Sequence, residues 1–484
     1  MSIDEIVPVG EGSTNNEVSP LISKADSSAS DPLTKYALFV AASLALGSFQ
    51  FGYHIGELNN PQAVISCDYI PKDTDQSSSL PSCIKMSETT FSFVTSIYIL
   101  GGLLGNLVAA KLASTFGRKN TLLYNTIFHV VGTLLLGLAY NTTSLFAGRF
   151  IVGIGGGISI VVVPMYLTEI APVAYRGLFG VFHQIGVVGG ILVAQTLGLF
   201  YSTVPGWRFI LSFCLLVSAV QLITFPFIVP SPRYLFSLPN GTEAARAVLC
   251  KLRGTDDVDQ ILLQWEKDDS DSDKENVSFS QLLTRPIYRR PLQILFLLHF
   301  TQQFSGINAI MQFSTTILKD TFTADAAKTI TVLINVGNLA FTLLSGYLIE
   351  KAGRRQLFLI STLLTGLSCA TLSFAMYFKY NYLAIVAINM IVVGFAIGLG
   401  PIPFVMPTEI FNTRSVATAA SVGLIANNIG NFVVTSVYLT LKKWFGPGAF
   451  LVFTVYLAIA LIISYKVIPE TKGKSFEAII QEWR

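Results

Sequence analysis

The stretch GRFIVGIGGGISIVVVPMYLTEIAPVAYRG, residues 148–177, decides the fold class of this chain. Its segment 150–168 carries no charge, while Arg149 precedes the segment and Glu169 follows it. About 20 such residues cross the hydrocarbon core of a bilayer as one helix. The stretch therefore predicts a membrane span at about 145–168 that ends in a polar, charged segment.

The rest of the chain repeats this pattern. Hydrophobic residues make up 52% of the 484 residues, charged residues only 13%, and the mean hydropathy is +0.59. Soluble domains carry about 25% charged residues, so a soluble protein is excluded, and so is a disordered chain. The net charge of +3 argues against a nucleic-acid partner. The other predicted spans are 36–58, 90–112, 121–140, 178–201, 208–229, 292–317, 327–349, 356–378, 382–406, 416–440 and 448–468.

Short motifs recur along the chain at nearly one spacing. The GRK at 117–119 returns as GRR at 353–355, after 353 − 117 = 236 residues, and the TEI at 168–170 returns at 408–410, after 240. Pro230 and Pro469 are 239 apart. The repeat predicts an all-α membrane protein whose 12 transmembrane helices form two parallel six-helix halves, as in transporters that bind at the midplane.

Charges divide the chain into regions. We expect a disordered cytosolic tail at 1–35, six-helix halves at 36–233 and 291–468, a cytosolic linker with short helices at 234–290 and a cytosolic tail at 469–484. Cations gather on the side of the tails, which by the positive-inside rule places both termini in the cytosol. Side chains there are predicted to pair and hold that face closed, or else only to set topology: Arg118, Glu169, Arg176, Arg233, Glu350, Arg354, Glu409 and Arg414.

The five cysteines fall in different environments. Cys67 and Cys83 lie in the one sizeable non-cytosolic loop, where an oxidising compartment would allow a disulfide, the alternative being two free thiols. Cys214, Cys250 and Cys369 are expected to be free.

Uncharged amides interrupt the apolar spans. Each is costly in a bilayer unless satisfied, so a cluster of them indicates a binding site, although amides also join helices as packing contacts. An amide both donates and accepts, as a sugar hydroxyl does, and carries no charge. Gln302 and Asn308 are six residues apart, and Asn427 and Asn431 are four apart, so we expect each pair to lie on one general face of a helix. Glycine and proline at 398–403 predict a broken helix, a gate beside the site.

The motifs together resemble the sugar porter family of the major facilitator superfamily, the group of glucose facilitators and fungal hexose transporters. They are GRF at 148–150, PMYLTEIAPVAYRG at 164–177, HQIG at 183–186, SPRYL at 231–235, QQFSGIN at 302–308, EKAGRR at 350–355, GPIP at 400–403 and PETKG at 469–473. The opening FGYHIGELNNPQ and the loop cysteines look closest to a fungal branch associated with the vacuole.

The resemblance implies a sugar site and also qualifies it. The implied contacts are Gln184, Gln302, Gln303, Asn308 and Asn338. The amide pattern adds Asn427, and Phe404 and, as a weaker candidate, Phe313 would offer apolar surface to the ring. Glucose facilitators commonly carry a Glu and a Trp where this chain has Ala396 and Phe404, and a Trp where it has Asn428. The site is therefore less acidic and less aromatic than that of a standard glucose transporter.

Coupling depends on His54 and Arg149. Proton-coupled members of the family have an Asp in FGYD near an arginine that matches Arg149, whereas this chain reads FGYH. A protonated histidine beside an arginine is disfavoured, which favours a uniporter. Proton coupling through His54 or the nearby Glu57, and a purely structural histidine, remain as alternatives.

The expected function is facilitated transport of a hexose by alternating access. The alternatives are a proton-coupled sugar or polyol symporter and a non-transporting sugar sensor. Four dispersed histidines and no nucleophile–base pair argue against an enzyme, a metal or a cofactor. Glu17, Leu21 and Ile22 fit an acidic dileucine motif for a sorting adaptor, which would direct a monomer to the vacuolar or endolysosomal membrane, with the plasma membrane as the alternative.

Overall fold

The computed structural model describes residues 33–68, 80–172, 175–204, 206–271, 277–319, 322–411, 415–471 and 479, and these form helices and connections without a strand. The predicted dileucine motif and Arg414 lie outside the described residues. For Arg176 and Glu350 only the backbone is described.

The first half consists of six spans. They are α1 (Lys35–Gly56), α3 (Glu88–Phe116), α4 (Arg118–Gly137), α5 (Thr142–Ile170), α6 (Arg176–Tyr201) and a sixth span built from α7 (Gly206–Ser212), α8 (Cys214–Thr224) and η2 (Phe225–Phe227). The short α2 (Gln62–Ile65) lies between the first two spans.

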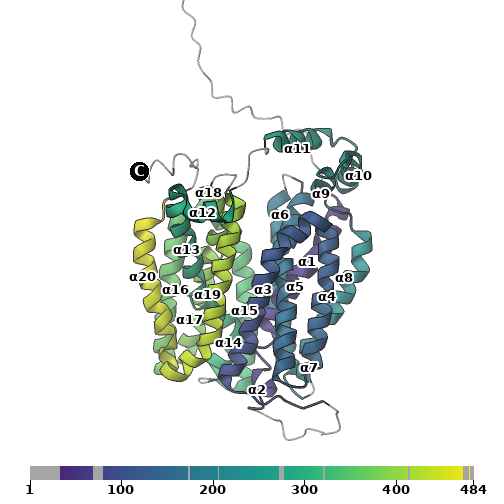
Figure 1. Cartoon of the computed structure of the whole chain (residues 1–484). Helices are drawn as coiled ribbons and strands as arrows, with labels where there is room; N and C mark the ends of the chain where they lie inside the picture. The colour runs from purple at the N-terminus through teal and green to yellow at the C-terminus, as the bar shows by residue number, and fades with distance from the viewer. Residues whose placement is uncertain are drawn as a thin grey trace, which may run out of the picture.

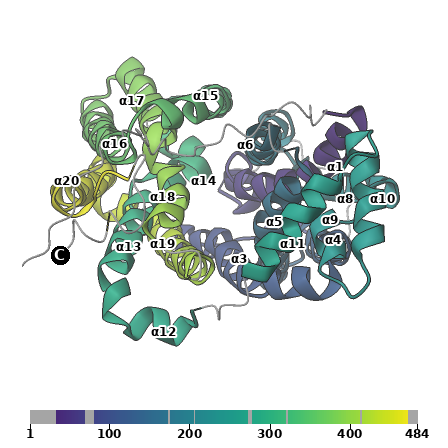
Figure 2. The same ribbon diagram turned by 90° about the horizontal axis from the view of Figure 1, so that it is seen from above.

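The second half repeats this order. It contains α13 (Arg289–Gln303) with α14 (Ile307–Leu318), α15 (Ala324–Lys351), α16 (Arg354–Tyr377), α17 (Asn381–Gly394) with η4 (Phe395–Leu399) and α18 (Ile402–Ile410), α19 (Val416–Phe445), and α20 (Ala449–Val467), which follows η5 (Gly446–Gly448). Figure 1 and Figure 2 show the two halves as separate groups of helices that lie next to each other. The expected twelve-helix fold is confirmed.

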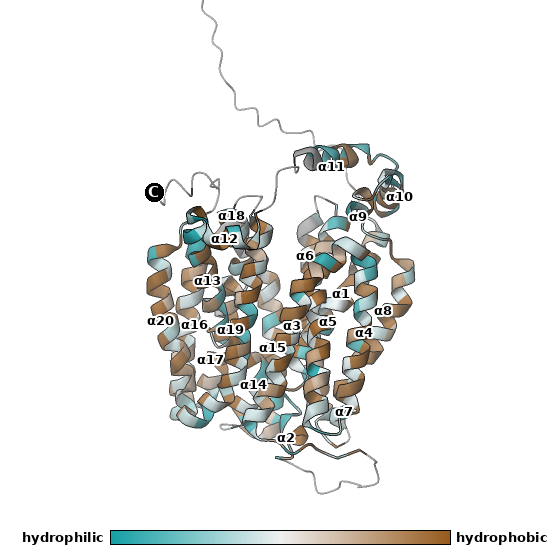
Figure 3. Cartoon of the chain, viewed as in Figure 1, coloured by the Kyte–Doolittle hydropathy of each residue, from teal (hydrophilic) through white to brown (hydrophobic). Residues whose placement is uncertain are grey.

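Nine helical segments of the described chain are long and apolar enough to cross a membrane, and the last of them, Thr418–Val467, contains most of α19 and all of α20. Two spans are not among these segments: the one made of α13 and α14, which is interrupted, and α4, which begins with the polar residues Arg118-Lys119-Asn120. In Figure 3 the ribbons of the spans are mostly brown to white, the colours of hydrophobic and intermediate residues.

The two ends of the bundle differ. The linker end carries α9 (Pro232–Phe236), α10 (Thr242–Arg253), α11 (Asp259–Asp271) and α12 (Phe279–Thr284), followed by η3 (Pro286–Tyr288). The opposite loop end carries α2 and the Cys67–Cys83 loop, at the bottom of Figure 1.

Linker helices are fastened to both halves. Arg253 of α10 donates hydrogen bonds to the last carbonyls of α5, 2.7 Å to Ile170 and 3.0 Å to Ala171. On the other side, Val277 accepts a bond of 2.7 Å from Thr418 of α19 and belongs to the core of the second half. The linker thus joins the two halves through docked segments.

Glycine explains how closely α3 and α5 pack. A Cβ atom on Gly101 would lie 2.1 Å from the carbonyl oxygen of Phe150, and one on Gly157 would lie 2.2 Å from that of Gly102. Only glycine allows this backbone contact, which is the usual role of small residues between membrane helices. The glycines of segment 153–157 are therefore packing residues.

Candidate functional site

A chain of amides crosses the middle of the second half. Asn308 donates to Gln303 Oε1, Gln303 Nε2 donates to Gln302 Oε1 at 3.3 Å, and Gln302 Nε2 donates to the carbonyl of Gly400 at 2.7 Å. Asn427 of α19 joins the chain by donating to Gln302 Oε1 at 2.6 Å. Four of the predicted amides and the predicted helix break at Gly400 thus belong to one hydrogen-bonded network.

The seventh span is broken at this network. Gly306 has a φ of +85°, which a side chain would disfavour, and it separates α13 from α14. Gln302 and Asn308 therefore lie on different helices, and the expectation that they share one helical face was wrong. The break lets Asn308 turn back toward Gln303.

The tenth span is also broken beside the network. A π-helical turn, Phe395–Leu399, leads into Gly400 and Pro401, and α18 begins at Ile402. Proline there lacks a donor, and the distorted turn leaves the Gly400 carbonyl available to Gln302. The predicted interruption is present and is tied directly to the amide chain.

The two candidate phenylalanines have opposite environments. Phe404 is 48% exposed and packs edge-on against His299 at 5.4 Å between ring centroids. Phe313 is 0% exposed and stacks on Tyr438 at 5.6 Å. Phe313 is therefore a core residue and cannot face a ligand in this conformation, which corrects its candidacy.

The remaining predicted contacts lie around the network. Gln184 is exposed on α6 of the first half, and Asn338 of α15 is half-buried, with its Nδ2 4.0 Å from Met311 Sδ. Asn431 accepts from Thr435 Oγ1 at 3.2 Å, which in turn accepts from Gln312. Asn427 and Asn431 thus belong to separate hydrogen-bonded groups.

A second polar cluster is enclosed in the first half. Glu57 accepts from Arg149 Nη1 at 2.8 Å and lies 3.0 Å from His54 Nδ1, and all three side chains are buried. Arg149 also donates to the His54 carbonyl and lies over the Tyr98 ring at 4.7 Å. The His54 ring stacks on His129 at 5.7 Å. Arg149 therefore pairs with the Glu57 carboxylate. Its hydrogen bond to His54 goes to the backbone carbonyl of the histidine and not to the imidazole ring.

The linker end carries the same three-residue contact in each half. In the first half, Arg118 donates to one carboxylate oxygen of Glu169 at 2.6 Å, and Ser231 donates to the other. In the second half, Arg354 donates to one carboxylate oxygen of Glu409 at 2.9 Å, and Thr471 donates to the other. Ser231 and Thr471 are 240 residues apart, the spacing of the two glutamates. The repeat therefore extends to individual contacts.

One position differs between these contacts. Glu470 accepts from the backbone N–H groups of Arg354 and Thr471, each at 3.0 Å, and so caps the start of α16. At the spacing of 240 its counterpart is Pro230, which has no carboxylate. Arg233 of the first half instead lies over the Trp265 ring of α11 at 5.4 Å.

Hydrogen bonds between the halves cluster at the loop end. Asn59 Nδ2 donates to the Met311 carbonyl at 3.0 Å and to Ser314 Oγ at 2.8 Å. Asn335 donates to Gln195 Oε1 at 2.5 Å. The amide criterion would have found Gln195 and Asn335, because each interrupts an apolar span.

Further contacts close the same end. Ser436 donates to Ser96 at 2.8 Å, and Thr316 donates to Gln62 at 2.5 Å. Burial and the charge of Lys328 lower the pKa of Lys319, which follows α14 at this end.

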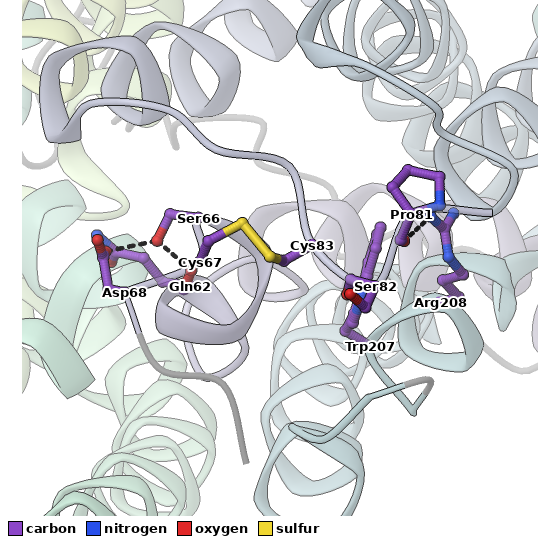
Figure 4. The surroundings of a disulfide bond; sticks show 9 residues. All are labelled: Gln62, Ser66, Cys67, Asp68, Pro81, Ser82, Cys83, Trp207 and Arg208. Carbon is purple, nitrogen blue, oxygen red and sulfur yellow. Dashed lines mark hydrogen bonds between the residues drawn. A yellow bond between two sulfur atoms is a disulfide. The ribbon is translucent and has the colours of Figure 1, made fainter. Parts of the chain in front are cut away.

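The loop is held by a disulfide. Cys67 and Cys83 are bonded, with Cα atoms 5.3 Å apart, and the other three cysteines are free. In Figure 4, Trp207 donates to Ser82 and Arg208 to Pro81, at 2.9 and 2.7 Å, so the loop is fixed to α7 as well.

Comparisons with known proteins agree with this architecture. Residues 40–483 match the family model described as sugar (and other) transporter. Facilitated glucose transporter member 3 of solute carrier family 2 from Ovis aries is 35% identical over 461 residues, 92% of each chain. Member 1 from Gallus gallus is 34% identical over 467 residues, covering 93% of this chain and 94% of the relative.

Solved structures share the fold. The inward-open conformation of the xylose transporter XylE from E. coli has a TM-score of 0.76 with 22% identity and covers 93% of this chain and 100% of that one. The proton:xylose symporter XylE bound to 6-bromo-6-deoxy-D-glucose has a TM-score of 0.72.

Proposed function

We propose, from the premise that this chain belongs to the family of sugar transporters, that it moves a hexose across a membrane by facilitated diffusion. The chain is a multi-pass membrane protein of a transporter class and not of an enzyme class. The observation that carries the proposal is the uncharged amide chain that ends on Gly400. Relatives named as facilitated glucose transporters support the hexose and the mode of transport.

The hydrogen bonds of the amide chain all run in one direction, which leaves acceptor atoms for a sugar at its start. Every bond from Asn308 to Gly400 donates in the same direction. Among the described residues, Oδ1 of Asn308 and Oδ1 of Asn427 receive no protein donor, so both are available to sugar hydroxyls. The exposed ring of Phe404 offers an apolar surface to the same ligand. We propose that Gln184 of α6 and Asn338 of α15, two helices that pack against each other, add further contacts to the bound sugar.

Transport then requires the halves to rock about this site. The contacts between the halves at the loop end support a conformation closed at that end. We propose that 36–233 and 291–468 are the moving bodies and that loop-end bonds break as the linker end closes. The charged residues of the linker end, including Arg176, Glu350 and Arg414, would pair across the halves in that second state.

A second candidate is proton-coupled sugar transport. The observation that favours it is the enclosed Glu57–Arg149 pair, which places a buried carboxylate against the arginine that the family resemblance connects with coupling. Uptake measured with and without a pH gradient separates the two candidates.

The cellular setting rests on sequence features. The positive-inside pattern supports both termini in the cytosol, and the dileucine motif of residues 17–22 supports delivery of a monomer by an adaptor to the vacuolar or endolysosomal membrane. Replacing Leu21 and Ile22 by alanine should redirect a fluorescently tagged protein to the plasma membrane. Unchanged vacuolar residence would remove the motif's role.

Counterflow of labelled glucose in proteoliposomes tests the transport proposal. Wild-type protein should show saturable exchange, and Gln302→Ala should abolish most of it. Gln221→Ala, at a buried glutamine of α8 outside the amide chain, should retain exchange and serves as the matched control. Saturable binding without exchange would instead identify a sugar sensor.

A further inference from the structure

His299 lies behind the amide chain and touches two of the proposed sugar contacts. It belongs to α13 and is 2% exposed. Asn427 Nδ2 lies 3.2 Å from its Nδ1, and the Phe404 ring packs against its ring at 5.4 Å. It has no place in the sugar contacts proposed above.

The Gly400 carbonyl fixes the direction of every bond in the network. A carbonyl only accepts, so the atom of Gln302 that lies 2.7 Å away must be the Nε2 amino group. Oε1 of Gln302 must then face Asn427, and it too only accepts. The atom that Asn427 turns toward Gln302 is therefore its amino group, Nδ2.

The same amino group faces His299. Because Nδ2 of Asn427 donates, Nδ1 of His299 has to accept, and an imidazole accepts at Nδ1 only when that nitrogen carries no proton. The groups packed on the ring from other helices are uncharged: Phe404 from α18, and Gly423 and Asn427 from α19. The network thus assigns His299 the neutral form with its proton on Nε2.

We infer that His299 is a positioning residue: its unprotonated Nδ1 holds the Asn427 amide so that Oδ1 of Asn427 faces the sugar. Without this acceptor, the Asn427 amide is held only by Gln302, and its carbonyl loses a fixed direction. The inference deepens the proposed function and rests on it.

Gly423 provides independent geometric support. A Cβ atom at this position would lie 2.5 Å from Nε2 of His299, so the ring occupies space that only glycine leaves open on α19. Gly423→Ala should therefore displace the ring and reproduce the loss of the His299 acceptor.

The test is the kinetics of glucose counterflow in proteoliposomes. His299→Leu should raise KM about tenfold, the effect of one lost hydrogen bond to an oriented site group, while kcat changes less than about twofold. His299→Gln, whose Oε1 can accept from Asn427, should restore KM to within about threefold of the wild type. His183→Leu removes a comparable histidine bond, 2.8 Å to Ser48, and should leave KM unchanged.

A double-mutant cycle completes the test. In an Asn427→Ala background, His299→Leu should cause no further rise in KM, because the group that it positions is gone. The inference would be overturned if the rises in KM of the two single variants multiplied in the double variant, or if His299→Leu left KM unchanged. Failure of the wild type to exchange any hexose would instead overturn the proposed function, so the two failures are distinguishable.

Discussion

Glu57 and Arg149 form an ion pair of 2.8 Å in which the side chains are 0% and 1% exposed. Removing one member of such a pair leaves an uncompensated buried charge, whereas replacing both by apolar residues does not. Glu57 directly follows α1, and Arg149 belongs to α5, so the pair also joins these two helices. The contact is thus structural, and it is also the contact on which the proton-coupled candidate depends.

Glu57→Leu is expected to destabilise the protein by about 3–5 kcal/mol because Arg149 loses its counter-charge. The measurement is the melting temperature of the purified protein in detergent. The double variant Glu57→Leu/Arg149→Leu should recover a large part of the lost stability. A double variant less stable than Glu57→Leu would contradict the pairing argument.

Sugar uptake should not depend on a pH gradient if transport is facilitated diffusion. We expect equal initial rates with and without an inward proton gradient, no accumulation above the external concentration and no sugar-dependent proton uptake in liposomes. Concentrative uptake that Glu57→Gln abolishes would instead establish the symport candidate.

The two candidate phenylalanines should separate binding from stability. Phe404→Ala should raise KM for glucose about five- to tenfold with little change in melting temperature, because the ring is half-exposed. Phe313→Ala, in the core against Tyr438, should cost about 3–5 kcal/mol of stability. The reverse pattern would show that Phe404 is a packing residue.

The cap on α16 offers a comparison between the halves. Glu470→Ala should lower stability by about 1 kcal/mol, because two backbone N–H groups lose their acceptor. Pro230→Ala, at the matching position of the first half, removes no such acceptor and should have a smaller effect on the melting temperature.

Thiol counting checks the disulfide. Denatured protein should react with three maleimides per chain without reductant and with five after reduction, since three of the five cysteines are free. Replacing Cys67 and Cys83 together by alanine should cost about 3 kcal/mol, the entropy of closing a loop of this length. Five reactive thiols without reductant would disprove the bond.

The fold was predictable because each span corresponds to an apolar run in the sequence, and because the charged motifs of the first half recur in the second. The pairing of Arg118 with Glu169 and of Arg354 with Glu409 follows from motifs that the sequence displays twice. The amides of the site were also visible, since each interrupts an apolar segment. These features depend on residue type and spacing alone.

Other parts of the site depended on three-dimensional relations. Gly306, in a left-handed conformation, places Gln302 and Asn308 on different helices. The spacing of residues in the sequence does not show whether a helix is straight or kinked at a glycine. Phe313 lies at a second irregularity, inside α14, where its own φ is −133° and ψ is 15°, and its ring is buried against Tyr438. The role of His299 could not be inferred either, because the direction of the amide chain depends on one backbone carbonyl 98 residues beyond Gln302.

The linker also sets a mechanical limit on the transport cycle. Helix α11, held by Arg233 on Trp265, moves with the first half, and Val277 is part of the second half's core. Six residue steps join Asp271 to Val277, and at about 3.5 Å per step their Cα atoms can be at most about 21 Å apart. While α11 stays on the first half and Val277 stays in the core of the second, this covalent connection limits how far the two halves can separate at the linker end.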